Sequence, residues 1–318
     1  PILMKKFIRG IFLFTVAVLF IAIIADIAIS KGLRCTERGH FYTMNALMNQ
    51  KMNADVIILG NSRAACSYHP SILDSILGIN SRNLGVSGQP FGISYLRWQL
   101  YRRNNIPPIL LIINMDYGEL NMVTNGFEKQ QYYPYISDTL VKPYLDLYGF
   151  TWMEKHIPMY RYRGDHKLIS IGLMELLHIR HDTKGEYIKG YSNKDWLWDG
   201  EKLETVLQNG KVKDQCNLKV VALLDGLLAE ADKVGTKVIF VYAPLINKLK
   251  ENLDEQTSLD AYHNLADKYH VPILDFTQMW ICSDTSYFHD ANHVNAKGAE
   301  IFTKELAFSI DSLGIFQK

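Results

Sequence analysis

An apolar run near the N-terminus constrains this chain more than any other feature. Residues Ile11 to Ile29 read IFLFTVAVLFIAIIADIAI, and Asp26 is the one charge among them. As an α-helix the run is about 28 Å long, close to the ~30 Å thickness of the hydrocarbon core of a bilayer. The sequence therefore predicts a transmembrane helix within an N-terminal membrane anchor over residues 1–30.

A cleaved signal peptide is the alternative interpretation, but the apolar run exceeds the roughly 7–15 residues usual in signal peptides. Flanking charge does not set the orientation, because three basic residues stand on each side: Lys5, Lys6 and Arg9 before the run, and Lys31, Arg34 and Arg38 after it. A short tail ahead of a large domain favours a domain outside the cytoplasm, on the periplasmic or extracellular side. The start Pro1-Ile2-Leu3-Met4 suggests that translation begins at Met4.

The charge balance excludes one class of partners. Lysine and arginine number 34 against 33 aspartates and glutamates, which gives a net charge of +1, and no long basic run occurs. Because nucleic-acid binding needs a basic face that neutralises phosphates, we expect no nucleic-acid partner. The four scattered cysteines make neither a disulfide framework nor a CxxC zinc site, although one or two bridges are compatible with the sequence: Cys35, Cys66, Cys216 and Cys282.

After a linker over residues 31–53, short apolar runs alternate with segments of helical periodicity. The runs typical of buried parallel strands are Asp55–Gly60, Ser81–Val86, Ile109–Asp116, Lys237–Ala243 and Pro272–Phe276. The segments with apolar residues at three- and four-residue spacing are Ile93–Arg103, Leu218–Val234, Ser258–His270 and Ala296–Leu313, and the stretch Ala64–Leu77 can begin a helix. This alternation predicts an α/β domain over residues 54–318, with a doubly wound, mainly parallel sheet of the three-layer, flavodoxin-like kind. Chemistry in such sheets takes place at the carboxyl ends of the strands.

The stretch from about residue 118 to 216 breaks the alternation and is rich in aromatic residues. We interpret it as an insertion or cap over the sheet. Its aromatic side chains could stack on sugar rings, but more often such residues fill the core of the cap itself. They are Tyr132, Tyr133, Tyr135, Tyr144, Tyr148, Trp152, Tyr160, Tyr162, Trp196 and Trp198.

A serine follows the first predicted strand directly, in Gly60-Asn61-Ser62-Arg63, where a helix can begin. Backbone N–H groups and the positive end of the helix dipole can stabilise negative charge beside its hydroxyl. A serine in this place is by itself most often an N-cap or turn residue. Ser62 therefore needs a partner base before it can be taken as a nucleophile.

Such a base stands near the C-terminus, in Asp290-Ala291-Asn292-His293. The three-residue spacing lets the carboxylate accept a hydrogen bond from the imidazole in the same turn. The other imidazole nitrogen is then free to take a proton from a serine. By itself the DxxH pattern also fits a solvent-facing loop with Asn295 as the N-cap of the last helix.

Taken together, three short motifs resemble those of the SGNH (GDSL-like) hydrolase family in order and context. They are Gly60-Asn61-Ser62, Asn83-Leu84-Gly85-Val86-Ser87-Gly88, and Asp290-x-x-His293. The resemblance covers about residues 55–116 and 218–310. It implies Ser62 as nucleophile, His293 and Asp290 as the rest of a triad, and the N–H groups of Ser62 and Gly88 in an oxyanion hole. It implies no metal and no organic cofactor.

This chain departs from the third motif of that family. A glycine-x-asparagine-aspartate block would supply an amide donor to the oxyanion hole, but here the strand ends Asn114-Met115-Asp116. In one register Asn114 keeps the donor. In the other, Asp116 takes the place, and its carboxylate would have to be protonated, turned away or paired with a residue such as Arg63.

Two further patterns are weaker. His178-x-x-His181-Asp182 has metal-ligand spacing but lacks a further ligand and follows an apolar helical stretch. Cys66 lies one helical turn after Ser62, and we interpret it as a packed core thiol, because nothing marks its pKa as lowered.

The sequence thus predicts a membrane-anchored, extracytoplasmic serine esterase or O-acyltransferase. Its expected substrates are acyl esters, with acetyl favoured, of envelope or other carbohydrates. With its predicted membrane anchor and divergent third block, the chain resembles the DltD-like and alginate-acetylation groups of envelope proteins. That resemblance implies a membrane-bound O-acyltransferase as partner. The main alternative is a non-catalytic SGNH-like glycan-binding or scaffold protein. An ordinary esterase acting on small esters is a third interpretation.

Overall fold

The computed structural model describes residues 2–122, 127–179, 187–193, 195–214 and 216–316. The chain forms two compact units, Pro1–Asn45 with Glu128–Thr183, and Ala46–Phe127 with Lys184–Lys318. The predicted insertion over residues 118–216 therefore divides between the two units. Residues 31–45, predicted as linker, belong to the first unit together with the anchor helix.

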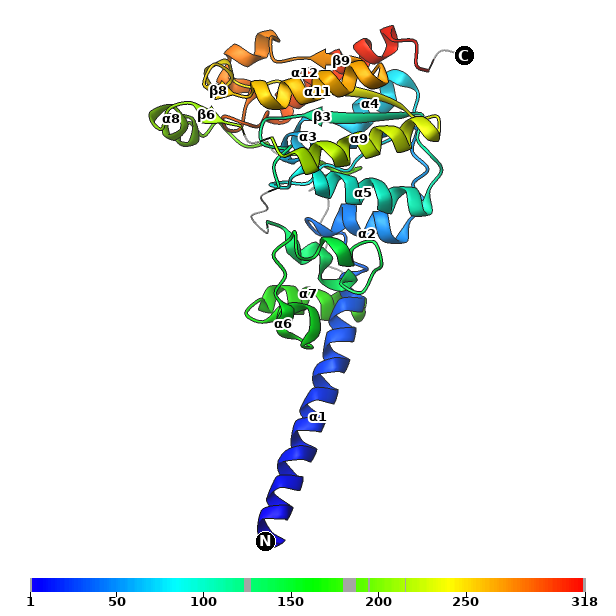
Figure 1. Ribbon diagram of the computed structural model, residues 1–318, viewed down its shortest axis with the longest axis vertical. Coiled ribbons are helices and arrows are strands. Elements are labelled where there is room, and N and C mark those ends of the chain that lie inside the picture. Colours follow the sequence, from blue (N-terminus) through cyan, green and yellow to red (C-terminus); the bar gives the residue numbers. More distant parts are fainter. Residues whose placement is uncertain (1, 123–126, 180–186, 194, 215, 317–318) are drawn as a thin grey trace. The chain divides into compact units, whose positions relative to one another are not determined.

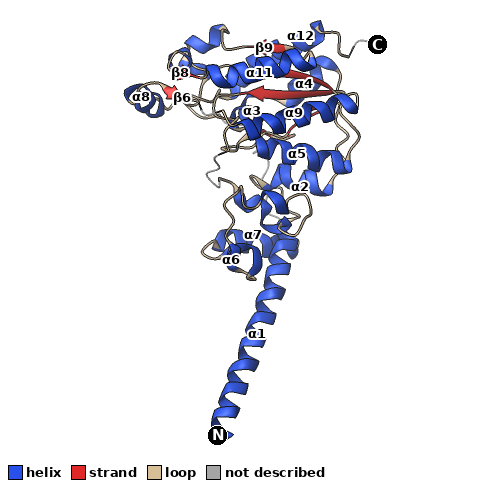
Figure 2. Ribbon diagram, viewed as in Figure 1, coloured by secondary structure: helices blue, strands red, loops and turns tan. Residues whose placement is uncertain are grey.

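The second unit is built on a five-stranded parallel sheet in the order β2-β1-β3-β7-β9. Its strands are β1 (Val56–Leu59), β2 (Ser81–Asn83), β3 (Leu110–Met115), β7 (Lys237–Tyr242) and β9 (Ile273–Asp275). Each strand lies within one of the predicted apolar runs. The predicted parallel α/β sheet is confirmed, and Figure 2 shows its strands in red between blue helices.

Helices cover both faces of this sheet, as a doubly wound fold requires. They are α3 (Ser62–Ser67), α4 (Pro70–Leu77), α5 (Phe91–Asn104), α9 (Leu218–Lys233), α11 (Gln256–Tyr269) and α12 (Ala296–Ser312). In Figure 1, α5 and α9 lie on the opposite side of β3 from α12. Tyr262 of α11 packs edge-on against Phe240 of β7, with ring centroids 5.3 Å apart.

The stretch over residues 64–77, where we expected a helix to begin, contains parts of two helices, α3 and α4. The backbone of His69 is extended, at φ −95° and ψ 101°, and Pro70 then begins α4. Proline disfavours helical geometry in the residue before it and cannot donate a backbone hydrogen bond inside a helix. The break at Pro70 therefore limits α3 to the short helix that carries Ser62.

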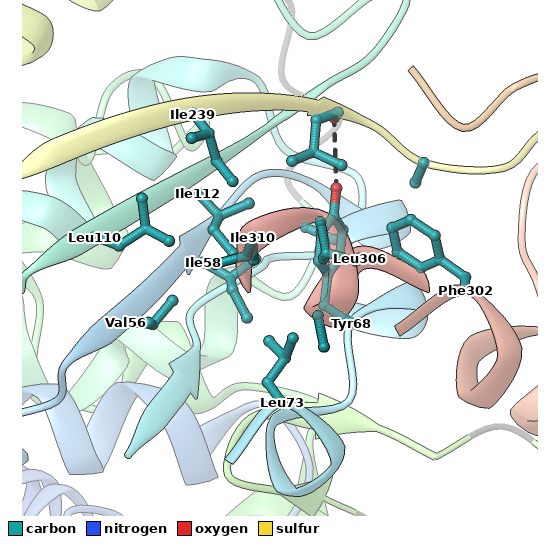
Figure 3. Close-up of a cluster of buried hydrophobic side chains, with 14 of the residues drawn as sticks. Val56, Ile58, Tyr68, Leu73, Leu110, Ile112, Ile239, Phe302, Leu306 and Ile310 are labelled. Atoms are coloured by element: carbon teal, nitrogen blue, oxygen red, sulfur yellow. Dashed lines mark hydrogen bonds between the residues drawn. The ribbon is translucent and has the colours of Figure 1, made fainter. Parts of the chain in front are cut away.

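One face of the sheet forms an apolar core with α3, α4 and α12, shown in Figure 3. Alternate residues of the strands contribute to it, as the two-residue period of a strand dictates. Tyr68, which follows α3, is fully buried in this core and packs edge-on against Phe302 of α12 at 5.0 Å. The core thus fixes the position of the α3 segment directly after β1.

Shorter elements complete the second unit. β4 (Tyr187–Ile188) pairs antiparallel with β5 (Tyr191–Ser192), and β6 (Val212–Lys213) pairs parallel with β8 (Leu253–Asp254). The remaining helices of this unit are α8 (Glu201–Gln208), α10 (Asn247–Lys250), and the 3-10 helices η4 (Trp280–Ser283) and η5 (Thr285–Tyr287). Helix α2 (Phe41–Asn49) begins in the first unit and ends in the second.

The first unit gathers around one end of α1 (Ile2–Leu33). Its other elements are η1 (Lys129–Tyr135), η2 (Lys142–Tyr144), α6 (Trp152–His156), η3 (Tyr160–Tyr162) and α7 (His166–Leu176). In the described part of the chain, α1 is the one helix long and apolar enough to cross a membrane. Its apolar side chains are exposed as far as Ile27, and burial begins at Ile29.

Helices α1 and α7 approach each other through two glycines. A Cβ added to Gly32 would lie 1.7 Å from the carbonyl oxygen of Gly172, and one added to Gly172 would lie 2.8 Å from that of Ile29. No larger residue fits at either place without moving the backbone. The C-terminal end of α1 is therefore packed specifically into the first unit (Figure 1).

Most of the insertion's aromatic residues in the first unit fill its core. Tyr132, Tyr148 and Tyr162 are almost completely buried, and the rings of Tyr132 and Tyr148 lie 4.3 Å apart. Trp152 in the first unit and Trp196 in the second stay exposed. The four cysteines form no disulfide bonds with one another, and Cys66 is buried, in agreement with its interpretation as a core thiol.

Candidate active site

Ser62 stands at the carboxyl end of β1 because Gly60 allows a sharp turn there. Gly60 has a φ of +149°, and a Cβ at this position would lie 2.8 Å from the Cβ atoms of both Ala64 and Asn114. Only glycine satisfies both conditions. Asn61 then caps the helix, since its Oδ1 accepts the N–H of Arg63 at 2.9 Å. Ser62 becomes the first residue of α3.

The hydroxyl of Ser62 is hydrogen-bonded to an imidazole that is itself hydrogen-bonded to a carboxylate. Ser62 Oγ lies 2.8 Å from His293 Nε2, and His293 Nδ1 lies 2.8 Å from Asp290 Oδ1. An ionised carboxylate only accepts, so the proton on Nδ1 points to Asp290 and leaves Nε2 to accept from Ser62. The arrangement can deprotonate the serine during attack on a carbonyl.

The turn that carries Asp290 is preorganised by its own backbone. Asp290 Oδ1 also accepts the N–H groups of Asn292, at 2.9 Å, and His293, at 3.0 Å, and the side chain is 1% exposed. Tyr117, in the loop after β3, donates its hydroxyl to Asn292 Oδ1. These contacts hold the carboxylate in one position relative to the imidazole ring.

The second motif positions a loop beside α3. Asn83 Nδ2 donates to the carbonyls of Ala64, at 2.8 Å, and Tyr68, at 2.9 Å, and its Oδ1 accepts the N–H of Gly85 at 2.9 Å. Further along, Gly88 is exposed and adopts a φ of +66°. Among the described residues, the backbone N–H groups of Ser62 and Gly88 find no hydrogen-bond acceptor. These two N–H groups are available to a ligand.

Asp116 is paired beneath the site, as one of the two predicted registers required. Its Oδ1 accepts from Arg63 Nη1 at 2.6 Å, and its Oδ2 accepts from Asn61 Nδ2. Arg63 Nη2 also donates to the carbonyl of Ala243 at 2.6 Å. Both charged side chains are nearly fully buried. Burial opposes the charge on Arg63, but Asp116 outweighs it, and the pKa of Arg63 is raised.

Asn114 lies in β3, two residues before Asp116, and is fully buried. Its Oδ1 accepts from the hydroxyl of Tyr68 at 2.7 Å. Its Nδ2 has no protein acceptor among the described residues. The predicted role of Asn114 as an oxyanion donor stays a prediction.

A second carboxyl group, Glu119, is buried close to Asp116. Burial raises the pKa of Glu119 well above its ordinary value, and the negative charge of Asp116 raises it further, while Arg63 lowers it. Burial and the neighbouring carboxylate of Asp116 thus both favour the neutral form of Glu119.

An exposed tryptophan lies next to the histidines of the DxxH turn. The ring of Trp196 packs edge-on against His289 at 4.6 Å, and the ring of His289 lies 6.2 Å from that of His293. Trp196 is 57% exposed. An exposed aromatic ring of this kind can stack on a flat apolar face of a ligand.

The structure thus brings together Ser62, His293 and Asp290, which lie in distant parts of the sequence. It places Asp116 and Arg63 as an ion pair beneath them. Sequence reasoning missed Asn61, which both caps α3 and donates to Asp116, and Tyr117, which holds the DxxH turn. The position of Tyr117 directly after a strand's carboxyl end was the signal that could have found it.

The weak metal pattern falls partly on residues 181 and 182, which lie outside the described residues. Among those that are described, no group of three or more His, Cys, Asp or Glu side chains could hold a metal ion.

No family model matches the sequence, and no curated protein matches it. Several solved structures superimpose on most of the chain. A psychrotrophic esterase from a Pseudoalteromonas species is 11% identical with a TM-score of 0.41, over 81% of this chain and 97% of its own. An acetylxylan esterase from Geobacillus stearothermophilus is 12% identical with a TM-score of 0.38, over 85% and 97%.

A third such structure is a GDSL-like lipase from Bacteroides thetaiotaomicron, which is 14% identical with a TM-score of 0.36, over 80% of this chain and 88% of its own. At these values the superpositions support no conclusion about chemistry. The chemistry of this chain has to be inferred from its own side chains.

Proposed function

We propose that the chain is a membrane-anchored serine esterase or O-acyltransferase of the SGNH type. The observation that carries the proposal is the hydrogen-bonded series Ser62, His293 and Asp290 at the carboxyl end of a parallel sheet. A serine on a turn is common, but a serine that donates to an imidazole oriented by a buried carboxylate is the arrangement that nucleophilic catalysis requires.

In the proposed reaction, Ser62 Oγ attacks the acyl carbonyl as His293 Nε2 takes its proton. The N–H groups of Ser62 and Gly88 stabilise the oxyanion that forms. His293 returns the proton to the departing alcohol oxygen, which leaves the acyl group on Ser62. Water then releases the free acid, or a second hydroxyl takes the acyl group. Asp290 keeps the His293 ring in the required tautomer throughout.

The substrate class follows from the surface beside the site. Trp196 presents an exposed ring next to the DxxH turn, and sugar rings carry apolar C–H faces that stack on such rings. We therefore favour acetyl esters of carbohydrates over purely lipidic esters.

Replacing Trp196 with alanine should raise KM for an acetylated xylo-oligosaccharide about fivefold, because the stacking surface is lost. KM for p-nitrophenyl acetate, which has no sugar ring, should stay unchanged. Trp152→Ala is the matched control, since Trp152 is also exposed but belongs to the first unit. Equal KM values for wild type and the Trp196 variant on the sugar substrate would remove the argument for carbohydrate.

We further propose that α1 is a retained anchor rather than a cleaved signal peptide. Asp26 pairs with Arg161 and accepts the N–H of Met159 at 2.8 Å, and Ser30 Oγ lies 2.7 Å from the hydroxyl of Tyr162. Cleavage would leave Arg161, whose side chain is 7% exposed, without its carboxylate. Removing one partner of a buried ion pair is strongly destabilising.

The extracytoplasmic location and the membrane-bound O-acyltransferase partner belong to the same proposal. Support for the partner comes from the resemblance to envelope-acylation proteins and from the exposed apolar surface of α1, which a second membrane protein can contact. Transfer instead of hydrolysis would depend on an acceptor that excludes water from the acyl-enzyme.

The test is covalent labelling of the full-length, detergent-solubilised chain with a fluorophosphonate, followed by peptide mass spectrometry. We expect one modified residue, Ser62, and loss of p-nitrophenyl acetate hydrolysis in proportion to labelling. Labelling without turnover would favour the acyltransferase over the esterase. A chain that neither labels nor turns over would refute catalysis and leave the glycan-binding or scaffold role.

A further inference from the structure

A pocket in the first unit lies between α1 and the segment from Pro134 to Arg161. Its volume is about 440 Å³. Four cationic side chains line it, together with a histidine and a single carboxylate: Lys31, Arg34, Lys155, Arg161, His156 and Asp26. None of these residues belongs to the proposed active site.

The apolar length of α1 indicates where the pocket lies relative to a bilayer. After Arg9, the exposed apolar side chains of the helix run from Ile11 to Ile27, and at 1.5 Å per residue this stretch is about 25 Å long, close to the ~30 Å hydrocarbon thickness. Ile23 and Ile27 line the pocket on one side, and Lys31 and Arg34 follow one and two turns later. With α1 across a bilayer, the pocket lies where acyl chains meet headgroups.

The charges that line the pocket are unbalanced. Arg161 pairs with Asp26, and Lys155 pairs at 2.6 Å with Asp146, whose side chain is 79% exposed. The ammonium of Lys31 makes no ion pair among the described residues. In addition, Arg161 Nε is buried and has no hydrogen-bond acceptor within the described structure. A buried donor without a partner and an excess of positive charge both favour an anionic ligand.

The surface around the pocket is typical of a membrane interface. Trp152 is 65% exposed in α6, and its ring stacks on His156 at 4.9 Å. Met153 and Ile157, in and just after the same helix, are also exposed apolar side chains. Tryptophan concentrates at the headgroup level of bilayers, and neighbouring lysines reach for phosphates there.

We propose that this pocket binds the phosphate of an anionic glycerophospholipid, with its acyl chains along Ile23 and Ile27. The bound lipid holds the first unit at the level of the headgroups. The inference rests on the part of the proposed function in which α1 spans a membrane, and it is independent of the chemistry at Ser62.

The test uses the full-length chain in detergent, and its mass shows that α1 is intact. The chain is titrated with short-chain phosphatidylglycerol or phosphatidylcholine, and binding is followed by native mass spectrometry. One equivalent of phosphatidylglycerol should bind, in clear preference to phosphatidylcholine. The double variant Lys31→Gln/Lys155→Gln should bind it about 30-fold more weakly, because two cations near the phosphate are lost.

The matched control is Lys142→Gln/Lys167→Gln, which removes the same charge from the same unit outside the pocket. Unchanged phosphatidylglycerol binding by the pocket variant, or an equal loss in the control, would overturn the proposal. Displacement of the lipid by millimolar inorganic phosphate would show a phosphate site without lipid selectivity and would also overturn it. Thermal unfolding of each variant, followed by circular dichroism, reports folding without any reaction at Ser62, so a failure here stays distinguishable from an inactive Ser62.

Discussion

Replacing Ser62 with alanine should lower kcat for p-nitrophenyl acetate hydrolysis by about 10⁶-fold, the size of loss seen when a triad serine is removed. The reason is that no other described group lies where His293 Nε2 could activate it for attack. The measurement is steady-state hydrolysis by the full-length chain in detergent. Ser309→Ala is the control, because this serine in α12 only donates to a backbone carbonyl within its own helix.

A companion variant tests whether the three residues act as a unit. Asp290→Asn should lower kcat by about 10⁴-fold, because an amide that donates to Nδ1 forces the imidazole proton onto Nε2, where it opposes Ser62. The double variant should be no slower than Ser62→Ala alone, since a missing nucleophile leaves nothing for the imidazole to activate. Independent, multiplying losses would show that Asp290 acts outside the proposed triad.

The fold was largely predictable because its signals are local and mutually consistent. Each strand of the five-stranded sheet lies in a short apolar run, and helices such as α9 and α12 start and end within about two residues of their predicted bounds. The break between α3 and α4 was not predicted, although Pro70 in the sequence indicates it. The sequence indicated only that a helix can begin after Ser62, and the effect of the proline on the residue before it was not considered.

The division into units could not be predicted in the same way. The segment from Glu128 to Thr183 packs with α1, far away in sequence, through Gly32, Gly172 and the ion pair of Asp26 with Arg161. A glycine that allows a close helix crossing has the same appearance in the sequence as one in a turn. The pairing of Asp116 with Arg63 was open for a similar reason, since alternation along a strand gives the face of a side chain but not its partner.

Replacing Arg63 with methionine should destabilise the second unit by about 3–5 kcal/mol, because it leaves the buried carboxylate of Asp116 without its cation. The carbonyls of Ala243 and Pro244 lose donors at the same time. Thermal unfolding of the full-length chain, followed by tryptophan fluorescence, should show a Tm lower by roughly 10 °C. Lys268→Met provides the matched control: Lys268 pairs with Asp225 at the same N–O distance of 2.6 Å, but its side chain is 54% exposed.

An exposed pair of this kind contributes only about 0–1 kcal/mol, so the control should hardly move Tm. Adding Asp116→Asn to Arg63→Met should recover part of the loss, because the unpaired charge is then gone. If the single variant were as stable as wild type, the ion pair of Arg63 with Asp116 would contribute nothing to the stability of the second unit. The departure of this strand end from the third SGNH motif would then have to be explained by something other than the ion pair of Asp116 with Arg63.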